Sequence, residues 1–136
     1  KSTSNCFSKV YGGTVAGRSI GGKAVYDNLL PNSVFSIGIS IRNNGDNTTT
    51  LGSASACGSR ITTNDYWLKI TEKKLAFRLA RHWAHEYTHI RGYRHDTNVP
   101  DAFQWGSDVN KDPAYGVGDV VGDVLDKWIT TKVITY

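Results

Sequence analysis

The chain is organised around the eleven residues HEYTHIRGYRH, numbered 85–95, which carry three of its four histidines. In a helix, side chains four residues apart project from one face, so His85 and His89 could reach a single cation. We expect zinc, because imidazole nitrogens are common zinc ligands in hydrolase-like motifs. Glu86 follows the first histidine directly, and this position is typical of a base beside metal-activated water rather than of a third ligand.

Gly92 predicts the end of that helix. A residue without a Cβ adopts a left-handed conformation at no steric cost, so the chain can turn back sharply there. The turn would bring His95 to the metal from outside the helix. Three protein ligands, His85, His89 and His95, leave a fourth position for water, as a catalytic zinc site requires. The alternative is an exposed helix that carries histidines without binding a metal.

The spacing HExxHxxGxxH resembles the signature of the metzincin metallopeptidases. Asp96 follows the third histidine, as in adamalysin-type members, and the chain is small like snapalysin-type enzymes, which carry aspartate at the third-ligand position. The resemblance implies an α+β, zincin-like fold, in which a small twisted sheet packs on the active-site helix and a second helix lies at the C-terminus. It also implies a zinc-dependent endopeptidase in which Glu86 is the general base.

The sequence departs from the metzincin pattern at the methionine turn, because it contains no methionine. Residues 112–116, DPAYG, stand where that turn would be expected, and they also resemble part of the aspzincin motif. Under that alternative an aspartate such as Asp112 replaces His95 as the third ligand. Astacin- and serralysin-like relatives use a tyrosine near the turn to stabilise the oxyanion, which implies this role for Tyr115, held in a tight turn. A core tyrosine is the alternative.

Three short strands are expected before the histidine-rich helix. Apolar residues alternate with small or polar ones in residues 33–42, which predicts a strand with one buried face, including Ile39 and Ile41. Residues 51–56 and 60–63 are two further strand candidates. In metzincin-like enzymes the edge strand just before the active-site helix binds extended substrate by β-augmentation. Residues 51–56 occupy the corresponding place in this chain, and a plain hairpin strand is the alternative.

Apolar residues at three- and four-residue spacing predict helices. The predicted helices are residues 23–30, 71–91 and 116–130. Thr71 is the expected N-cap of the second. His82 lies one turn before the first motif histidine, and we expect it to be a packed or supporting histidine. Gly118 and Gly122 lower the helix propensity of the last segment, which suggests close packing against another backbone.

Composition indicates a single globular domain over residues 1–136. The net charge of +4 is spread along the chain, whereas a nucleic-acid-binding protein more often shows one basic stripe or a stacking motif, so no nucleic-acid partner is expected. No hydrophobic run is long enough to span a bilayer, so no membrane association is expected either. We expect a monomer.

The only two cysteines, Cys6 and Cys57, do not form a metal-binding CxxC pattern. A disulfide between them is the preferred interpretation, and it predicts a secreted, extracellular protein. Two unrelated buried thiols are the alternative. Because the sequence starts at Lys1 rather than methionine, we expect a processed chain or a piece of a longer one, from which any signal or pro-segment has been removed.

The function expected from the motif is hydrolysis of a protein or peptide substrate with Zn²⁺ as cofactor, Glu86 as base and Tyr115 as oxyanion donor. Two other classes remain open. One is a zinc hydrolase that acts on a different amide, for example in cell-wall peptide. The other is a non-catalytic, zinc-stabilised binding module, against which Glu86 argues, because a purely structural site needs no base.

Overall fold

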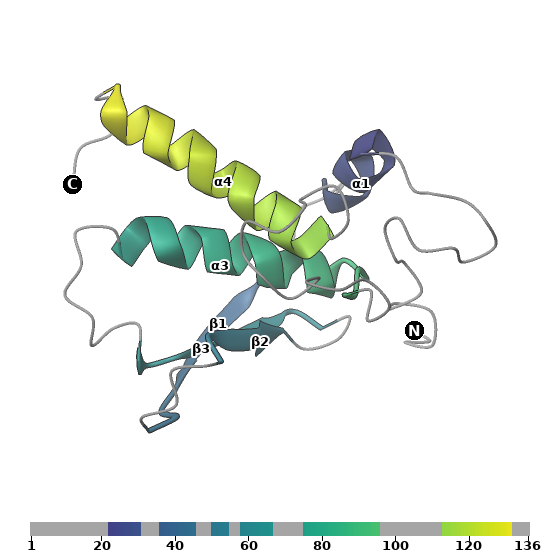
Figure 1. The fold of residues 1–136 in the computed structure, drawn as a ribbon. Helices are drawn as coiled ribbons and strands as arrows, with labels where there is room; N and C mark the ends of the chain where they lie inside the picture. The colour runs from purple at the N-terminus through teal and green to yellow at the C-terminus, as the bar shows by residue number, and fades with distance from the viewer. Residues whose placement is uncertain are drawn as a thin grey trace.

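The computed structural model describes residues 22–30, 36–45, 50–54, 58–66, 75–95 and 113–131. Within these residues a small sheet, the helix with the histidine motif and a second long helix form successive layers, with a short helix beside them (Figure 1). The elements in chain order are α1 (Gly22–Leu29), β1 (Gly38–Arg42), β2 (Gly52–Ala54), β3 (Arg60–Asn64), α3 (Leu75–Ile90) and α4 (Pro113–Thr130). The α+β class expected from the sequence is therefore confirmed.

The three strands of the described sheet lie in the order β1-β3-β2. β1 runs parallel to β3 over its whole length, and β2 runs antiparallel to β3, with Gly52 opposite Thr63. The strand predicted over residues 51–56 is seen over Gly52–Ala54. β2 forms one edge of this sheet, on the side that carries α3.

The prediction of one buried face in residues 33–42 is wrong for two of its members. Ile39 is 48% exposed and Ile41 is 60% exposed, whereas their partners across the ladder, Ile61 and Thr63, are buried. The reason lies in the position of α3, which packs mainly on β2 and β3. Strand periodicity defines the two faces of β1, but the helix that would cover one of them lies over its neighbours.

Helix α3 is attached to the sheet by polar as well as apolar contacts. Trp83 Nε1 donates a hydrogen bond to Thr63 Oγ1 at 3.0 Å. Beside it, Gly52 of β2 approaches the imidazole of His82 so closely that a Cβ would lie 2.6 Å from Nε2. The absence of a side chain at Gly52 therefore sets how closely β2 approaches the helix.

Helix α4 packs on the side of α3 opposite the sheet (Figure 1). A Cβ at Gly122 would lie 3.2 Å from Phe77 Cζ and 3.3 Å from Arg81 Cδ. Close packing at this position agrees with the prediction from the glycines, but the atoms that approach Gly122 belong to side chains rather than to another backbone. Arg81 also forms an ion pair with Asp119 across the two helices. These contacts fix α4 along α3 and bring its first turn near the histidine motif.

Helix α1 is held at the C-terminal end of α3, and it confirms the short helix predicted over 23–30. Tyr87 Oη donates to the Leu29 carbonyl at 2.5 Å. Arg91 donates from Nε and Nη2 to the Asn28 carbonyl at 2.9 and 2.7 Å. These bonds satisfy carbonyls that a helix leaves unpaired at its C-terminus.

The two long helices agree with the ranges predicted from the sequence, except at the start of α4. Helix α3 accounts for most of the predicted residues 71–91. Helix α4 begins at Pro113, before the predicted start at residue 116. Proline is favourable at the first position of a helix, because its φ is already helical and its missing N–H would have no partner there. Among the described residues, no helix has the length and apolar character needed to cross a membrane.

Some predictions concern residues outside the described ranges. They are the disulfide between Cys6 and Cys57, the N-cap at Thr71, and the aspartates Asp96 and Asp112.

Candidate metal centre

Two histidines face each other on one side of α3. His85 and His89 lie four residues apart, and their Nε2 atoms are 3.2 Å from each other. A neutral imidazole has one N–H and one lone pair, so the two nitrogens can either share a hydrogen bond or direct both lone pairs at one cation. The helical spacing therefore brings both rings together, as predicted.

The chain turns back after α3 in a Schellman motif. Gly92 has a φ of 100°. The N–H of Tyr93 donates to the Thr88 carbonyl at 3.2 Å, and the N–H of Gly92 donates to the His89 carbonyl at 2.9 Å. Together these bonds satisfy two of the last carbonyls of the helix, and glycine adopts the left-handed φ without steric penalty. The helix stop predicted at Gly92 is confirmed.

His95 reaches the same place from outside the helix. Its ring centroid lies 5.2 Å from that of His85 and 4.6 Å from that of His89. One nitrogen of each ring lies within 4.8 Å of the nitrogens of the other two. The structure thus brings together the three predicted ligands, which are close enough to bind one metal ion.

A backbone carbonyl orients one of the three rings. His89 Nδ1 lies 2.7 Å from the Tyr93 carbonyl oxygen, so Nδ1 donates and Nε2 presents its lone pair to the centre. Such carbonyl partners fix the tautomer and the orientation of metal-binding histidines.

His85 is also held in the protonation state that a metal requires. Burial, together with the neighbouring His89 and His95, lowers the pKa of His85 to about 2. Metal ions bind the neutral imidazole and compete with protons for it. The surroundings of His85 therefore keep its imidazole neutral, so that a nitrogen lone pair is available to a metal ion.

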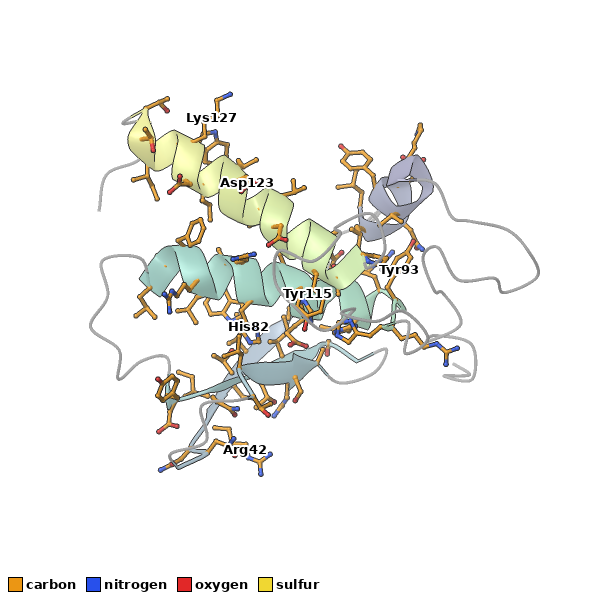
Figure 2. All side chains as sticks on the ribbon, in the orientation of Figure 1. Arg42, His82, Tyr93, Tyr115, Asp123 and Lys127 are labelled. Carbon is orange, nitrogen blue, oxygen red and sulfur yellow. The ribbon has the colours of Figure 1, made fainter. Side chains whose placement is uncertain are left out.

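Glu86 is buried beside the three histidines. Burial raises its pKa to about 7, against the opposing effects of His95 and of a hydrogen bond from the Ala54 backbone in β2. A carboxyl group of this pKa can both accept and release a proton near neutral pH, as general acid–base catalysis requires. Its Oε1 lies 3.7 Å from Nδ1 of His82, which Figure 2 shows between α3 and the sheet.

Tyr115 lies at the centre, but the tight turn predicted to hold it is wrong. It belongs to the first turn of α4, because that helix already begins at Pro113. Its ring is stacked on His95 with centroids 5.1 Å apart and meets His85 edge-on at 4.5 Å. A helix rather than a methionine-type turn therefore presents an aromatic ring to two of the candidate ligands.

Several partners of the centre carry no signal in the sequence, because they are backbone groups. The carbonyl of Tyr93 orients His89, and the Ala54 amide contacts Glu86. The pairing of His82 with Glu86 does have a signal, their i,i+4 spacing. The role expected for His82, that of a packed or supporting histidine, rests instead on its position three residues before His85.

No protein-family model, curated protein or solved structure matches this chain. Its function must therefore be inferred from the residues of the centre themselves.

Proposed function

We propose that this protein is a zinc-dependent endopeptidase with a metzincin-like, zincin-type fold. The observation that carries the proposal is the convergence of His85, His89 and His95 around one point, with a buried glutamate following the first of them. The motif spacing supports the same conclusion, since HExxHxxGxxH is the metzincin signature. The layering of a small sheet on the histidine-bearing helix is compatible with this fold.

The donor set suits zinc. Zinc binds imidazole nitrogens in four-coordinate sites, and in catalytic sites three protein ligands leave one position for water or substrate. His89 has a backbone carbonyl partner of the kind that supports zinc-binding histidines. When bound, zinc would polarise the scissile carbonyl and acidify a water molecule.

Glu86 performs the proton transfers in the proposed reaction. It takes a proton from water as the water attacks the carbonyl carbon, and it delivers that proton to the leaving amine. The Ala54 amide restrains the carboxylate from the sheet side. We propose that Tyr115, whose ring lies against His85 and His95, stabilises the oxyanion with a hydrogen bond from its hydroxyl.

Strand β2 is the proposed binding site for the peptide substrate. It forms an edge of the described sheet, and its Ala54 contacts the base. A free strand edge binds an extended peptide through main-chain hydrogen bonds, with little dependence on side chains. A substrate strand paired with β2 would therefore run past Glu86.

The test combines metal analysis with a proteolysis assay. The purified protein should contain one equivalent of zinc and cleave a denatured, alkylated protein, and a chelator should abolish cleavage until zinc is restored. Glu86→Gln is the matched control for a contaminating peptidase. Zinc-loaded protein that cleaves no peptide bond would contradict the proposal. Cleavage restricted to cell-wall peptide would favour the amide hydrolase, and a zinc-dependent fold without hydrolysis would favour the binding module.

A further inference from the structure

We infer that His82 is a positioning residue for Glu86, which holds one carboxyl oxygen of the base so that the other faces the reacting water. This inference deepens the proposed peptidase function and rests on it. His82 lies one helical turn before Glu86 on α3, and its side chain is almost completely buried, with 3% of its surface exposed. Residues at this spacing share one face of a helix.

The contact between the two side chains is specific. Nδ1 of His82 lies 3.7 Å from Oε1 of Glu86. This separation exceeds that of a hydrogen bond, but a small rotation of either side chain closes it. Hydrogen bonds between catalytic groups are often long before substrate is bound and shorten in the reacting complex. Because both groups are buried, the interaction between them is stronger than it would be in water.

The surroundings of Nε2, the second ring nitrogen of His82, indicate which of the two nitrogens carries the proton. Within the part of the chain that the structure describes, Nε2 of His82 has no hydrogen-bond partner. A neutral imidazole offers one N–H donor and one acceptor, and interiors tolerate an unpaired acceptor more readily than an unpaired N–H. The proton therefore belongs on Nδ1, beside the carboxylate of Glu86. Burial lowers the pKa of His82 to about 4, which keeps the ring neutral at pH 7.

Strand β2 holds the ring on its other side. A Cβ at Gly52 would lie 2.6 Å from Nε2 and 2.8 Å from Cε1 of His82, so the imidazole already fills the space above this glycine. The ring cannot move away from Glu86 in that direction. Ala54 of the same strand donates to Glu86 directly. His82 thus contacts both Glu86, the proposed base, and β2, the strand proposed to bind substrate.

These contacts assign different roles to the two carboxyl oxygens of Glu86. A hydrogen bond from a neutral N–H to a carboxylate is charge-assisted and fixes the plane of the carboxyl group. With Oε1 restrained by His82, Oε2 is left to accept the proton. Misplacing a catalytic group by about 1 Å can cost about 100-fold in rate. Loss of the Nδ1 contact should therefore lower turnover more than it lowers substrate binding.

Two amide substitutions separate positioning from packing. In His82→Asn the side-chain amide nitrogen is as many bonds from Cβ as Nδ1, whereas in His82→Gln it matches Nε2. We expect His82→Asn to retain most of the turnover. His82→Gln should lose about 10- to 100-fold in kcat, with KM and zinc content unchanged. If His82 only filled space, the larger glutamine would restore turnover as well as asparagine or better, and that result would overturn the inference.

A spectroscopic measurement tests the same contact without turnover. In zinc-loaded protein labelled with ¹⁵N-histidine, the signals absent from His82→Asn belong to His82, and we expect them to show the Nδ1–H tautomer. The Nε2–H tautomer would overturn the positioning role while leaving the peptidase function intact. A parent protein without peptidase activity would remove both proposals, so the two failures are distinguishable.

Discussion

Replacing Gly52 with alanine should destabilise the protein, because β2 approaches α3 through this glycine. The added Cβ would lie 2.6 Å from Nε2 and 2.8 Å from Cε1 of His82, and it would also clash with the Thr62 carbonyl oxygen of β3. Cβ atoms are essentially never found within 3.0 Å of such neighbours. The Thr62 carbonyl belongs to the central strand of the described sheet, so it cannot turn aside as a flexible side chain would.

The expected loss of stability follows from two opposing terms. Overpacking of a well-packed interior costs about 1–3 kcal/mol, and the involvement of backbone favours the upper end of this range. Alanine also restricts the unfolded chain more than glycine does, which offsets about 0.4–1 kcal/mol. We therefore expect the free energy of unfolding to fall by about 2 kcal/mol. For a chain of this length that corresponds to a decrease in Tm of about 6–10 °C.

Urea unfolding followed by tryptophan fluorescence would measure the change. Gly38→Ala is the matched control, because a Cβ at Gly38 would lie 3.5 Å from the Ser59 carbonyl oxygen, an ordinary van der Waals contact in the same sheet. We expect this control to leave stability unchanged or to raise it by up to about 1 kcal/mol, because only the unfolded-state effect of alanine remains. Equal stability of the Gly52 and Gly38 variants would refute the close approach of β2 to α3, and with it the support of His82 by β2.

Four further predictions address the centre itself. His95→Ala should weaken zinc binding by more than about 100-fold in a competition titration, because a direct ligand contributes more than an outer partner; unchanged affinity would instead favour an aspartate such as Asp112. Glu86→Gln should keep zinc and Tm but lose about 100- to 10,000-fold in kcat, and parent-like turnover would exclude Glu86 as the base. Tyr115→Phe should leave zinc content and Tm unchanged while kcat falls by about 10- to 1,000-fold; a lower Tm with unchanged kcat per folded molecule would indicate a packing role. Burial lowers the pKa of His82 from 6.5 to about 4. As pH falls, the unfolded chain therefore takes up a proton at His82 at a higher pH than the folded chain does. His82 should therefore contribute a loss of about 3 kcal/mol to the stability of metal-free protein as pH falls from 6.5 towards 4. The parent curve should accordingly be steeper than that of His82→Asn, in which His85 still titrates, and equal slopes would contradict this assignment.

The ligand geometry could be predicted from sequence because it depends on local rules. Four-residue spacing places His85 and His89 on one helix face whatever surrounds the helix. Gly92 ends the helix through its own backbone freedom, and the Schellman hydrogen bonds involve only its immediate neighbours. The return of His95 to the centre follows from these two features, because only two residues separate it from the turn.

The remaining features depend on tertiary contacts that no local pattern encodes. The alternation in β1 correctly indicates a strand, but whether Ile39 and Ile41 are covered depends on where α3 lies across the sheet. Likewise, the composition around Tyr115 suits a turn as well as a helix start, and the packing of α4 on α3 decides between them. Pro113 itself favours the start of a helix, since proline is common at the first helical position.

Each motif residue on α3 is oriented by an element outside that helix. The turn after α3 provides the carbonyl for His89, the first turn of α4 provides the Tyr115 ring that contacts His85, and β2 provides the amide for Glu86. An isolated α3 peptide would therefore carry the motif without the arrangement. The centre forms only when β2 and α4 have docked, and a metal that binds the folded form stabilises that docking by mass action. Zinc affinity should consequently fall in variants that loosen the α3–α4 contact at Gly122, although this residue touches none of the ligands.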